Sequence, residues 1–482
     1  MSPQKDVASL FHEATHRHAG KRLHFPALDR SITYGELGHA SARVATALRA
    51  REVHPRERIG LLFSTNPEAL EAFFGVLAAS ATPVPLPQPS ASGDLTAYVA
   101  RLARILRDGR IRRVLVSDDF EASARDLLEA GGFEVTIAGV GELLNEAPVP
   151  EPLPPVDPSQ LALVQYTSGS TSEPKGVALT HANLLAGVLA ISEGIQVTSD
   201  DVNGQWLPLH HDMGLIGLIA GVLAGVTHHL WSPASFIRHP DRWLLEFARR
   251  RATIYAGPSF SYASMLARVS DEQLRELDLS AWRVAFNGAD TIDPACLEGF
   301  LRRFGAAGFA PSTMFPVYGL AEATLAVTFP PLGAPPAIDW VERSSAAGAG
   351  EVRALPAGDA RARGIVSVGS AVLGHQVRVT GAGGQQLPSR QVGEIEVRGP
   401  AVMSAYFGRT PGDSGITGDG WLRTGDLGYL SQGRLFVTGR TKEMIVVRGV
   451  KLYPQDVEAA VRGLPGVYKR RAIAFSINGT RP

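Results

Sequence analysis

The chain has 482 residues, 45% of them apolar and 20% charged, and its 47 Lys and Arg residues balance its 47 Asp and Glu residues. This length exceeds one typical domain of roughly 100–200 residues and is ample for a large core. The neutral balance gives no electrostatic reason to expect a nucleic acid or an anionic membrane as partner. A single cysteine, Cys296, excludes an intramolecular disulfide, and no Cys/His cluster has zinc spacing. We therefore expect a reducing, cytoplasmic setting.

The first half of the chain alternates strand-like and helix-like patterns. Residues 58–63 and 113–117 form short apolar runs typical of buried strands, and residues 83–86 return to an extended pattern. Residues 67–79 begin with a proline suited to a first helical turn, and residues 95–106 repeat apolar side chains at helical intervals. Strand–helix–strand alternation predicts an α/β fold with a mostly parallel sheet.

No segment predicts a membrane span or a leader. The first 18 residues contain no apolar signal core. The longest apolar stretch, residues 213–225, is shorter than the ~20 residues that a membrane helix needs, so we predict a buried helix there and no stable membrane insertion.

Three segments interrupt the regular patterns, and no internal repeat is present. Residues 83–89 and 147–158 are proline-rich and predict loops or linkers. Residues 329–364 are rich in Pro, Gly, Ala and Ser, which predicts either a long loop or a small appended element. From Leu435 the chain is denser in charge, and a helix pattern over residues 454–462 predicts the start of a second small domain.

The strongest chemical motif covers residues 163–181, where an apolar run leads into hydroxyls and glycines and then Pro174, Lys175 and Gly176. Small residues let backbone amides wrap around an anion, and a lysine adds a point charge. The hydroxyls that can donate to phosphate oxygens are Thr167, Ser168, Ser170, Thr171 and Ser172. The Walker pattern is absent, so this is a different phosphate loop. The alternative is a flexible Ser/Gly linker, which would need neither the leading strand nor the helix pattern that follows.

Two further motifs are weak when taken alone. In residues 317–324, Tyr318 could stack on a base and Glu322 could hold a metal ion, although a structural role is the commoner explanation. In residues 421–430, Asp426 is predicted in a Gly-flanked turn, where its carboxylate could accept hydrogen bonds from two ribose hydroxyls. An ordinary turn aspartate is the alternative.

A His–His–Asp cluster lies in residues 208–217. Adjacent residues rarely converge on one metal without an i,i+4 helical spacing, so metal ligation is disfavoured. The residues that follow are uniformly apolar, which favours a polar gate beside an apolar pocket.

Taken in this order, the motifs resemble the adenylate-forming superfamily of acyl-CoA synthetases, non-ribosomal-peptide adenylation domains and luciferases, from about Ser31 to the end of the chain. Within it the chain is most similar to the fatty acyl-AMP ligases. The segments that carry this closer similarity are residues 207–217, 232–262, 318–328 and 446–458, the last reading VVRGVKLYPQDVE.

The resemblance implies a large α/β N-terminal adenylate-forming domain, with parallel and mixed sheets layered with helices and a distorted β-barrel subdomain, followed by a small, incomplete α+β C-terminal domain. The implied boundaries are residues 1–439 and 440–482. Residues 329–364 would be a family-specific insertion that disfavours coenzyme A. The implied cofactors are ATP and Mg²⁺, the substrate is a fatty acid, and the partner is the phosphopantetheine thiol of an acyl carrier protein.

The resemblance also implies a role for individual residues. Those implied to bind the nucleotide are Thr167, Ser168, Gly169, Ser170, Thr171 and Lys175 at the phosphates, Gly288, Ala289, Asp290, Tyr318 and Gly319 at the adenine, Thr324 at the α-phosphate, and Asp426 with Arg440 at the ribose. Those implied at the acyl pocket are His211, Met213, Gly214, Ile216, Ser259 and Phe260, with residues 213–219 and 255–262 as tunnel walls. Glu322 would bind Mg²⁺, and Lys442 would be the hinge. The residues implied to be catalytic are Thr167, Lys175, His211 and Glu322.

One departure from the family pattern concerns a late lysine of the small domain, which in the family bridges the carboxylate and the α-phosphate. The sequence reaches Pro482 before that motif, and neither Lys442 nor Lys451 takes its place. We therefore expect a truncated form with impaired adenylation. Three hypotheses remain: a fatty acyl-AMP ligase, an acyl-CoA synthetase, and a non-catalytic module that binds ATP or acyl-adenylate.

Overall fold

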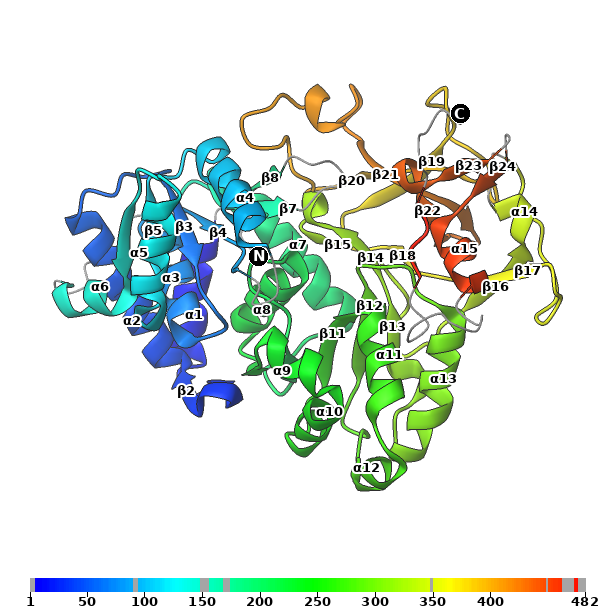
Figure 1. The fold of residues 1–482 in the computed structure, drawn as a ribbon, viewed down its shortest axis with the longest axis horizontal. Coiled ribbons are helices and arrows are strands. Elements are labelled where there is room, and N and C mark those ends of the chain that lie inside the picture. The colour runs from blue at the N-terminus through cyan, green and yellow to red at the C-terminus, as the bar shows by residue number, and fades with distance from the viewer. Residues whose placement is uncertain are drawn as a thin grey trace.

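The computed structural model describes residues 5–89, 94–147, 156–167, 174–346, 350–447, 450–461 and 472–475. The N-terminal helices and strands lie at one end of the molecule, a larger α/β region forms the middle, and a strand-rich region forms the other end (Figure 1).

The N-terminal region is built on a parallel four-stranded sheet of order β4-β3-β5-β6. Its strands are β3 (Arg58–Leu62), β4 (Thr82–Pro85), β5 (Arg113–Val116) and β6 (Thr136–Gly139). Its helices are α2 (Tyr34–Ala50), α3 (Pro67–Ala78), α4 (Leu95–Asp108), α5 (Glu121–Ala130) and α6 (Val140–Glu146). Helix α3 begins with Pro67 after an Asn66 cap, as its sequence predicts. The predicted parallel strand–helix alternation is confirmed.

The central region contains a seven-stranded sheet of order β13-β12-β11-β9-β10-β1-β2, in which only the β1–β2 pair is antiparallel. Its strands are β1 (Arg22–Phe25), β2 (Arg30–Thr33), β9 (Val202–Gln205), β10 (Thr227–Leu230), β11 (Ile254–Pro258), β12 (Val284–Gly288) and β13 (Met314–Pro316). Its helices are α1 (Val7–Arg17), α7 (His181–Ile195), α8 (Asp212–Ala224), α9 (Pro233–Arg238), α10 (Pro240–Arg249), α11 (Ser259–Arg268), α12 (Asp271–Glu276) and α13 (Pro294–Phe304).

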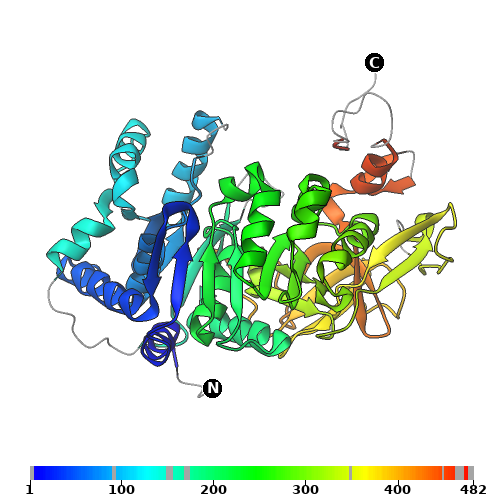
Figure 2. The ribbon, with the colours of Figure 1, turned by 90° about the horizontal axis from the view of Figure 1, so that it is seen from below.

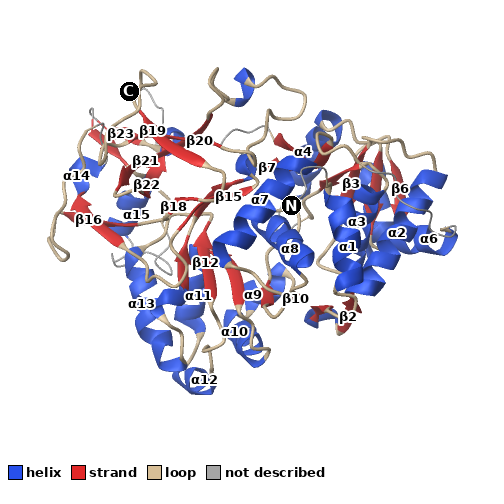
Figure 3. Ribbon diagram, turned by 180° about the vertical axis from the view of Figure 1, so that it is seen from behind, coloured by secondary structure: helices blue, strands red, loops and turns tan. Residues whose placement is uncertain are grey.

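Helices α7 and α8 pack against each other over this sheet (Figure 3). Most of α8 is buried, which confirms the buried helix predicted over residues 213–225. No helix in the described part of the chain is long and apolar enough to cross a membrane.

The strand-rich region holds the strands expected to form a distorted barrel, and they lie in three sheets. These are β14 (Tyr318–Leu320) with β15 (Leu325–Phe329) and β18 (Ser370–Ala371); β16 (Ile338–Glu342) with β17 (Ala362–Val366); and β19 (Gln376–Thr380) with β20 (Gly393–Arg398), β21 (Leu422–Ser431) and β22 (Arg434–Arg440). A separate antiparallel pair, β7 (Leu161–Thr167) and β8 (Lys175–Thr180), flanks the predicted phosphate loop.

The composition of residues 329–364 left open a long loop or a small appended element. The structure shows an element with strands and a short helix. Strands β16 and β17 pair antiparallel, and α14 (Arg343–Ala346) follows β16. Val341 and Ile365 pack in one buried cluster with Tyr429 and Phe436 of the neighbouring sheet. The element is therefore part of the folded wall of this region.

The turn predicted around Asp426 is wrong, because Asp426 lies within strand β21, opposite Arg440 of β22. Gly425 adopts φ of 74°, and the register shifts at Leu427–Gly428. The glycines thus permit a bulge, which aims a side chain without ending the strand.

The last described part of the chain comprises η7 (Thr441–Glu443), β23 (Ile445–Val447), β24 (Val450–Leu452) and α15 (Pro454–Val461). The predicted helix over residues 454–462 is confirmed over residues 454–461, and residue 462 lies outside the described residues. The Tyr453 hydroxyl lies 2.8 Å from Thr438 Oγ1 of β22, which fixes the start of α15 at the edge of the strand-rich region (Figure 2).

Candidate functional site

Two adjoining cavities lie where the central and strand-rich regions meet. The smaller has a volume of about 330 Å³ and the larger of about 600 Å³. Both are lined by Ala289, Val317, Tyr318, Gly319, Arg440 and Glu443. A molecule that occupies one cavity can therefore contact a molecule in the other.

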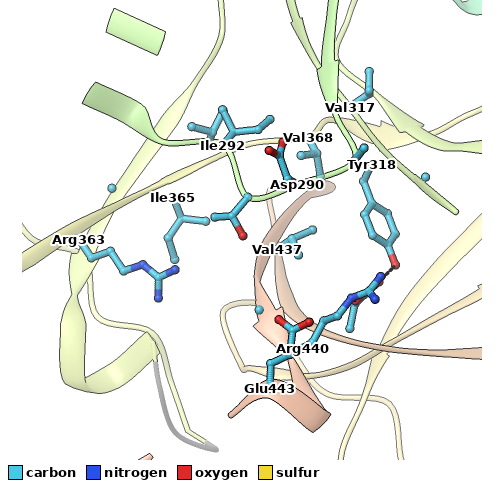
Figure 4. A pocket seen from close by; sticks show the side chains of 17 residues that line it. Asp290, Ile292, Val317, Tyr318, Arg363, Ile365, Val368, Val437, Arg440 and Glu443 are labelled. Atoms are coloured by element: carbon cyan, nitrogen blue, oxygen red, sulfur yellow. Dashed lines mark hydrogen bonds and ion pairs between the residues drawn. The ribbon is translucent and has the colours of Figure 1, made fainter. Parts of the chain in front are cut away.

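A buried carboxylate lines the smaller cavity and is held by two of the shared residues. Asp426 accepts a hydrogen bond from the Tyr318 hydroxyl at 2.6 Å and another from Arg440 Nε at 2.7 Å. Burial, and then the Asp426 charge, hold the pKa of Tyr318 well above its ordinary value, so the phenol remains a donor. Figure 4 shows the Tyr318 hydroxyl and the Arg440 side chain converging on this point. The arrangement fixes the carboxylate while its remaining lone pairs stay available for ligand hydroxyls.

The loop after β12 forms another wall of the smaller cavity. Ala289, with φ of 66°, and Asp290 both line it. Asp290 Oδ1 accepts a hydrogen bond from the Ser259 backbone N–H at 2.6 Å, and burial raises the pKa of this carboxyl. Gly288 lines neither cavity; a Cβ there would lie 2.9 Å from the Val317 side chain, so its role is close packing.

The predicted phosphate loop is only partly within the described residues. Thr167 lines the larger cavity and ends β7, and Lys175 begins β8. Ser168, Gly169, Ser170 and Thr171 lie outside the described residues. Lys175 lines neither cavity, and its Nζ lies 5.0 Å from the centre of the Tyr406 ring.

Glu322 lines the larger cavity and accepts a hydrogen bond from the Tyr406 hydroxyl at 2.6 Å. No group of three or more His, Cys, Asp or Glu in the described ranges could cage a metal. Mg²⁺ is usually held by one or two carboxylates together with substrate phosphates, so the Glu322 carboxylate fits that ion without a larger cluster. Sequence reasoning missed Tyr406, because it lies outside every motif and only the fold brings it to Glu322.

The structure does not place Thr324 at the site. Thr324 is buried, and its hydroxyl donates to the Ala401 carbonyl at 2.6 Å. Its methyl fills the space left by Gly187, where a Cβ would lie 2.6 Å away. Its side chain is therefore committed to packing between helix α7 and the strand-rich region.

The far end of the larger cavity carries the His–His–Asp cluster. His211 Nδ1 lies 2.7 Å from Asp212 Oδ1, and this hydrogen bond raises the pKa of His211. Burial lowers the pKa of the neighbouring His210 to about 4. Both histidines line the cavity, and the polar gate stays a prediction.

Only some of the apolar residues of α8 line the larger cavity, because the others lie on a different face of the helix. Met213 and Gly217, one turn apart, line it. Gly214 uses its carbonyl to accept from Gln205 at 2.8 Å, and Ile216 is fully buried in the core. A rear cavity of about 50 Å³ shares Ile191, Gly217, Ala256 and Phe286 with the larger one.

Two residues expected at the acyl pocket lie elsewhere. Ser259 and Phe260, at the start of α11, line neither of the two main cavities, and Phe260 is 48% exposed. Tyr255 donates to Ser261 at 2.8 Å and accepts from Trp206 at 2.9 Å inside an aromatic core. Of the expected wall over residues 255–262, only Ala256 reaches the larger cavity.

This fold, with two adjoining cavities and a buried carboxylate in the smaller one, is that of an adenylate-forming enzyme. The family described as "AMP-binding enzyme" matches residues 11–407, and the chain belongs to it. This membership confirms the resemblance inferred from the motifs.

Individual relatives and a solved structure are also similar to this chain over most of its length. The chain is 33% identical over 458 residues, covering 93% of itself and 79% of the relative, to a Caulobacter vibrioides protein provisionally named an acyl-CoA synthetase. It is 34% identical over 448 residues, covering 89% of itself and 75% of the relative, to a medium-chain-fatty-acid–[acyl-carrier-protein] ligase of Moorena producens. A structure from a study of fatty acyl-adenylate ligases of E. coli and L. pneumophila matches with a TM-score of 0.90 and 31% identity, over 96% of this chain and 84% of that one.

Proposed function

We propose that the protein activates a fatty acid as acyl-adenylate, with release of pyrophosphate, and then passes the acyl group to the phosphopantetheine thiol of an acyl carrier protein in the cytoplasm. The observation that carries this proposal is the sharing of Tyr318 and Arg440 by the two cavities. A nucleotide in one cavity and an acyl chain in the other would meet at this junction.

In the first step a carboxylate oxygen forms a bond to the α-phosphorus, and the bond from that phosphorus to the pyrophosphate oxygen breaks. Both reactants are anions, so the site has to offset their repulsion and fix their geometry. Lys175 and the Thr167 hydroxyl are the described groups that would face the phosphates. A bound Mg²⁺ at Glu322 would supply charge neutralisation. Asp426, held by Tyr318 and Arg440, would accept the ribose hydroxyls, and Ala289 with Asp290 would flank the adenine.

The acyl chain would occupy the larger cavity along Met213, Gly217 and Ala256. Burial contributes roughly 0.8 kcal/mol per CH₂, so a ~12-carbon tail supplies several kcal/mol of binding. In the second step the thiol loses its proton to solvent, its sulfur bonds to the acyl carbon, and AMP leaves. His211 would stand at the polar edge of this cavity.

The domain boundary proposed between residues 439 and 440 falls directly before Arg440 and the short helix η7, where Lys442 is exposed. We propose Lys442 as the hinge and residues 329–364 as the element that disfavours coenzyme A. Deleting that element is a poor test, because Arg363 and Gly364 line the smaller cavity and would be lost with it.

A direct test is incubation with Mg-ATP and a series of fatty acids, with and without coenzyme A, followed by mass spectrometry. We expect acyl-AMP that persists in the presence of coenzyme A. Acyl-CoA would instead establish the second candidate, an acyl-CoA synthetase, which the name of the Caulobacter relative favours. Binding of ATP without any adduct would establish a non-catalytic module.

A further inference from the structure

One segment carries a large excess of basic residues, although the chain as a whole is neutral. Residues 95–113 contain six arginines and one aspartate, whereas the whole sequence has equal numbers of basic and acidic residues. The single aspartate, Asp108, accepts a hydrogen bond from the Tyr166 hydroxyl at 2.6 Å. The segment therefore presents a strong local excess of positive charge.

The packing of helix α4 places most of these positive charges on the exposed side of the helix and of the turn that follows. Helix α4 buries Leu102, Ile105 and Leu106 in a cluster that includes Val164 and Tyr166 of β7. The opposite face and the turn that follows are exposed and carry what we call the α4 arginine surface: Arg104, Arg107, Arg110 and Arg112. The apolar face of the helix packs on the core, and these four arginines lie on its exposed side and in the turn that follows.

The α4 arginine surface continues into a hollow of about 690 Å³ at the amino ends of β3 and β5. Five arginines and two glutamates line this hollow, and one of the glutamates, Glu57, is paired with Arg113 at 3.0 Å. The surface and the hollow thus form one concave basic region.

This basic region reaches the wall of the larger cavity. Arg101, on the same helix, lines that cavity together with Pro87. Arg101 and Arg107 are separated by about 9 Å along the helix axis, at 1.5 Å per residue. A macromolecule seated on the arginines would therefore lie next to this wall, within reach of the larger cavity for a flexible arm.

We propose that the α4 arginine surface docks an acidic acyl carrier protein, whose phosphopantetheine arm enters the larger cavity past Arg101 and Pro87. This inference rests on the proposed function. Opposite charge steers such encounters and fixes their orientation. An anionic membrane is the disfavoured occupant, because interfacial binding also needs an apolar face. The one large exposed hydrophobic side chain described on α4 is Leu95, at the other end of the helix.

The test compares Arg104→Glu/Arg107→Glu with a matched control, Arg242→Glu/Arg302→Glu, which reverses two exposed arginines on α10 and α13 (Figure 1). The probe is a purified acyl carrier protein with more acidic than basic residues and a phosphopantetheine arm. Binding is measured directly by biolayer interferometry, and acyl transfer is measured to the carrier and to free pantetheine. Arg104→Gln/Arg107→Gln repeats the measurement with a smaller change.

We expect the Glu variant to raise the Kd for the carrier by about tenfold or more, the Gln variant by less, and the control to leave it unchanged. Added salt should weaken wild-type binding more than binding by the Glu variant. Acyl-AMP formation and transfer to pantetheine should be unchanged.

Three results would overturn the docking proposal: no binding of the carrier by the wild type, an equal Kd in the wild type and the Glu variant, or arginine-dependent binding of phosphatidylglycerol vesicles in place of the carrier. A wild type that binds the carrier but forms no acyl-AMP would instead contradict the proposed function, so the two failures are distinguishable.

Discussion

Asp426 is the residue on which the proposed nucleotide site most depends, because two side chains hold its buried carboxylate. We expect Asp426→Asn to raise the KM for ATP by about 10- to 100-fold, since a hydrogen bond to a charged group contributes about 1.5–3 kcal/mol. Initial-rate kinetics of pyrophosphate release over a range of ATP concentrations would measure this. Tyr318→Phe, which keeps the ring and removes one of the two groups that hold the carboxylate, should raise the KM by less. An unchanged KM in Asp426→Asn would place the ribose elsewhere.

Gly217 would set the depth available to an acyl chain in the proposed pocket, because it lines both the larger and the rear cavity. A Cβ at Gly217 would meet nothing within 4 Å, so a side chain there would project into the open space. We expect Gly217→Leu to shift the preference toward shorter acids. The loss in kcat/KM should be about fourfold for each displaced CH₂ at 0.8 kcal/mol.

Competition between fatty acids of different length in one acyl-AMP assay would measure this shift, with Gly217→Ala as the graded intermediate. The KM for ATP should not change in either variant. An unaltered length preference in Gly217→Leu would show that the chain takes another route.

Residues with a motif were predictable from the sequence, and residues defined by packing were not. Tyr318 and Asp426 stand in short patterns that are weak alone and gain weight from their order along the chain, and the fold brings them within hydrogen-bonding distance. Tyr406 reaches Glu322 across 84 positions of sequence, a contact that no local pattern encodes. Thr324 has the right residue type, but its hydroxyl is used inside the core.

At the scale of elements, helices and strands with strong periodicity and clear caps were predicted well. The helix over residues 67–79 has an apolar face, a proline at its start and an asparagine cap, and it is observed as Pro67–Ala78. Strand β21 was misjudged at Asp426 because glycine suggests a turn, whereas here it permits a bulge in a continuous ladder. The β16–β17 hairpin could not be predicted, because its stability comes from packing on Tyr429 and Phe436.

The segment formed by β24 and α15 is attached through Tyr453, which is buried and lies beneath the Arg363 guanidinium at 5.1 Å. We expect Tyr453→Ala to release residues 450–461, because loss of a large buried aromatic side chain costs about 3–5 kcal/mol. Hydrogen exchange of peptides from residues 450–461 should accelerate, while exchange in β20 and β21 should not. Tyr453→Phe, which removes only the hydroxyl near Thr438, should cost about 1 kcal/mol. Equal exchange in wild type and Tyr453→Ala would show that other contacts hold the segment.

At the scale of the whole molecule, one hydrophobic core joins the N-terminal and central regions. Helix α3 contributes most of its residues to this core, and the rings of Phe74 and Phe11 stack at 3.8 Å. Glu71 lies in the middle of this helix and is only 9% exposed. Burial, and then the nearby Glu68, raise the pKa of Glu71 to about 7, although Arg30 opposes the shift. A single buried carboxyl therefore links the stability of the core to pH.

The direction of this linkage follows from the raised pKa. The folded protein holds the Glu71 proton up to about pH 7, whereas the unfolded chain releases it near the ordinary value of 4.5. The free energy of unfolding is thus highest, with respect to Glu71, below pH 4.5, and this contribution is lost as pH rises through 7. We expect Glu71→Gln to be more stable than the wild type at pH 8, by up to ~3 kcal/mol at 1.36 kcal/mol per pKa unit, and to differ little from it at pH 4.5. Thermal unfolding between pH 4.5 and 8.5 measures this difference, and Glu276→Gln, at an exposed position on α12, is the control. A constant gap between Glu71→Gln and wild type across that range would mean that Glu71 does not titrate with folding.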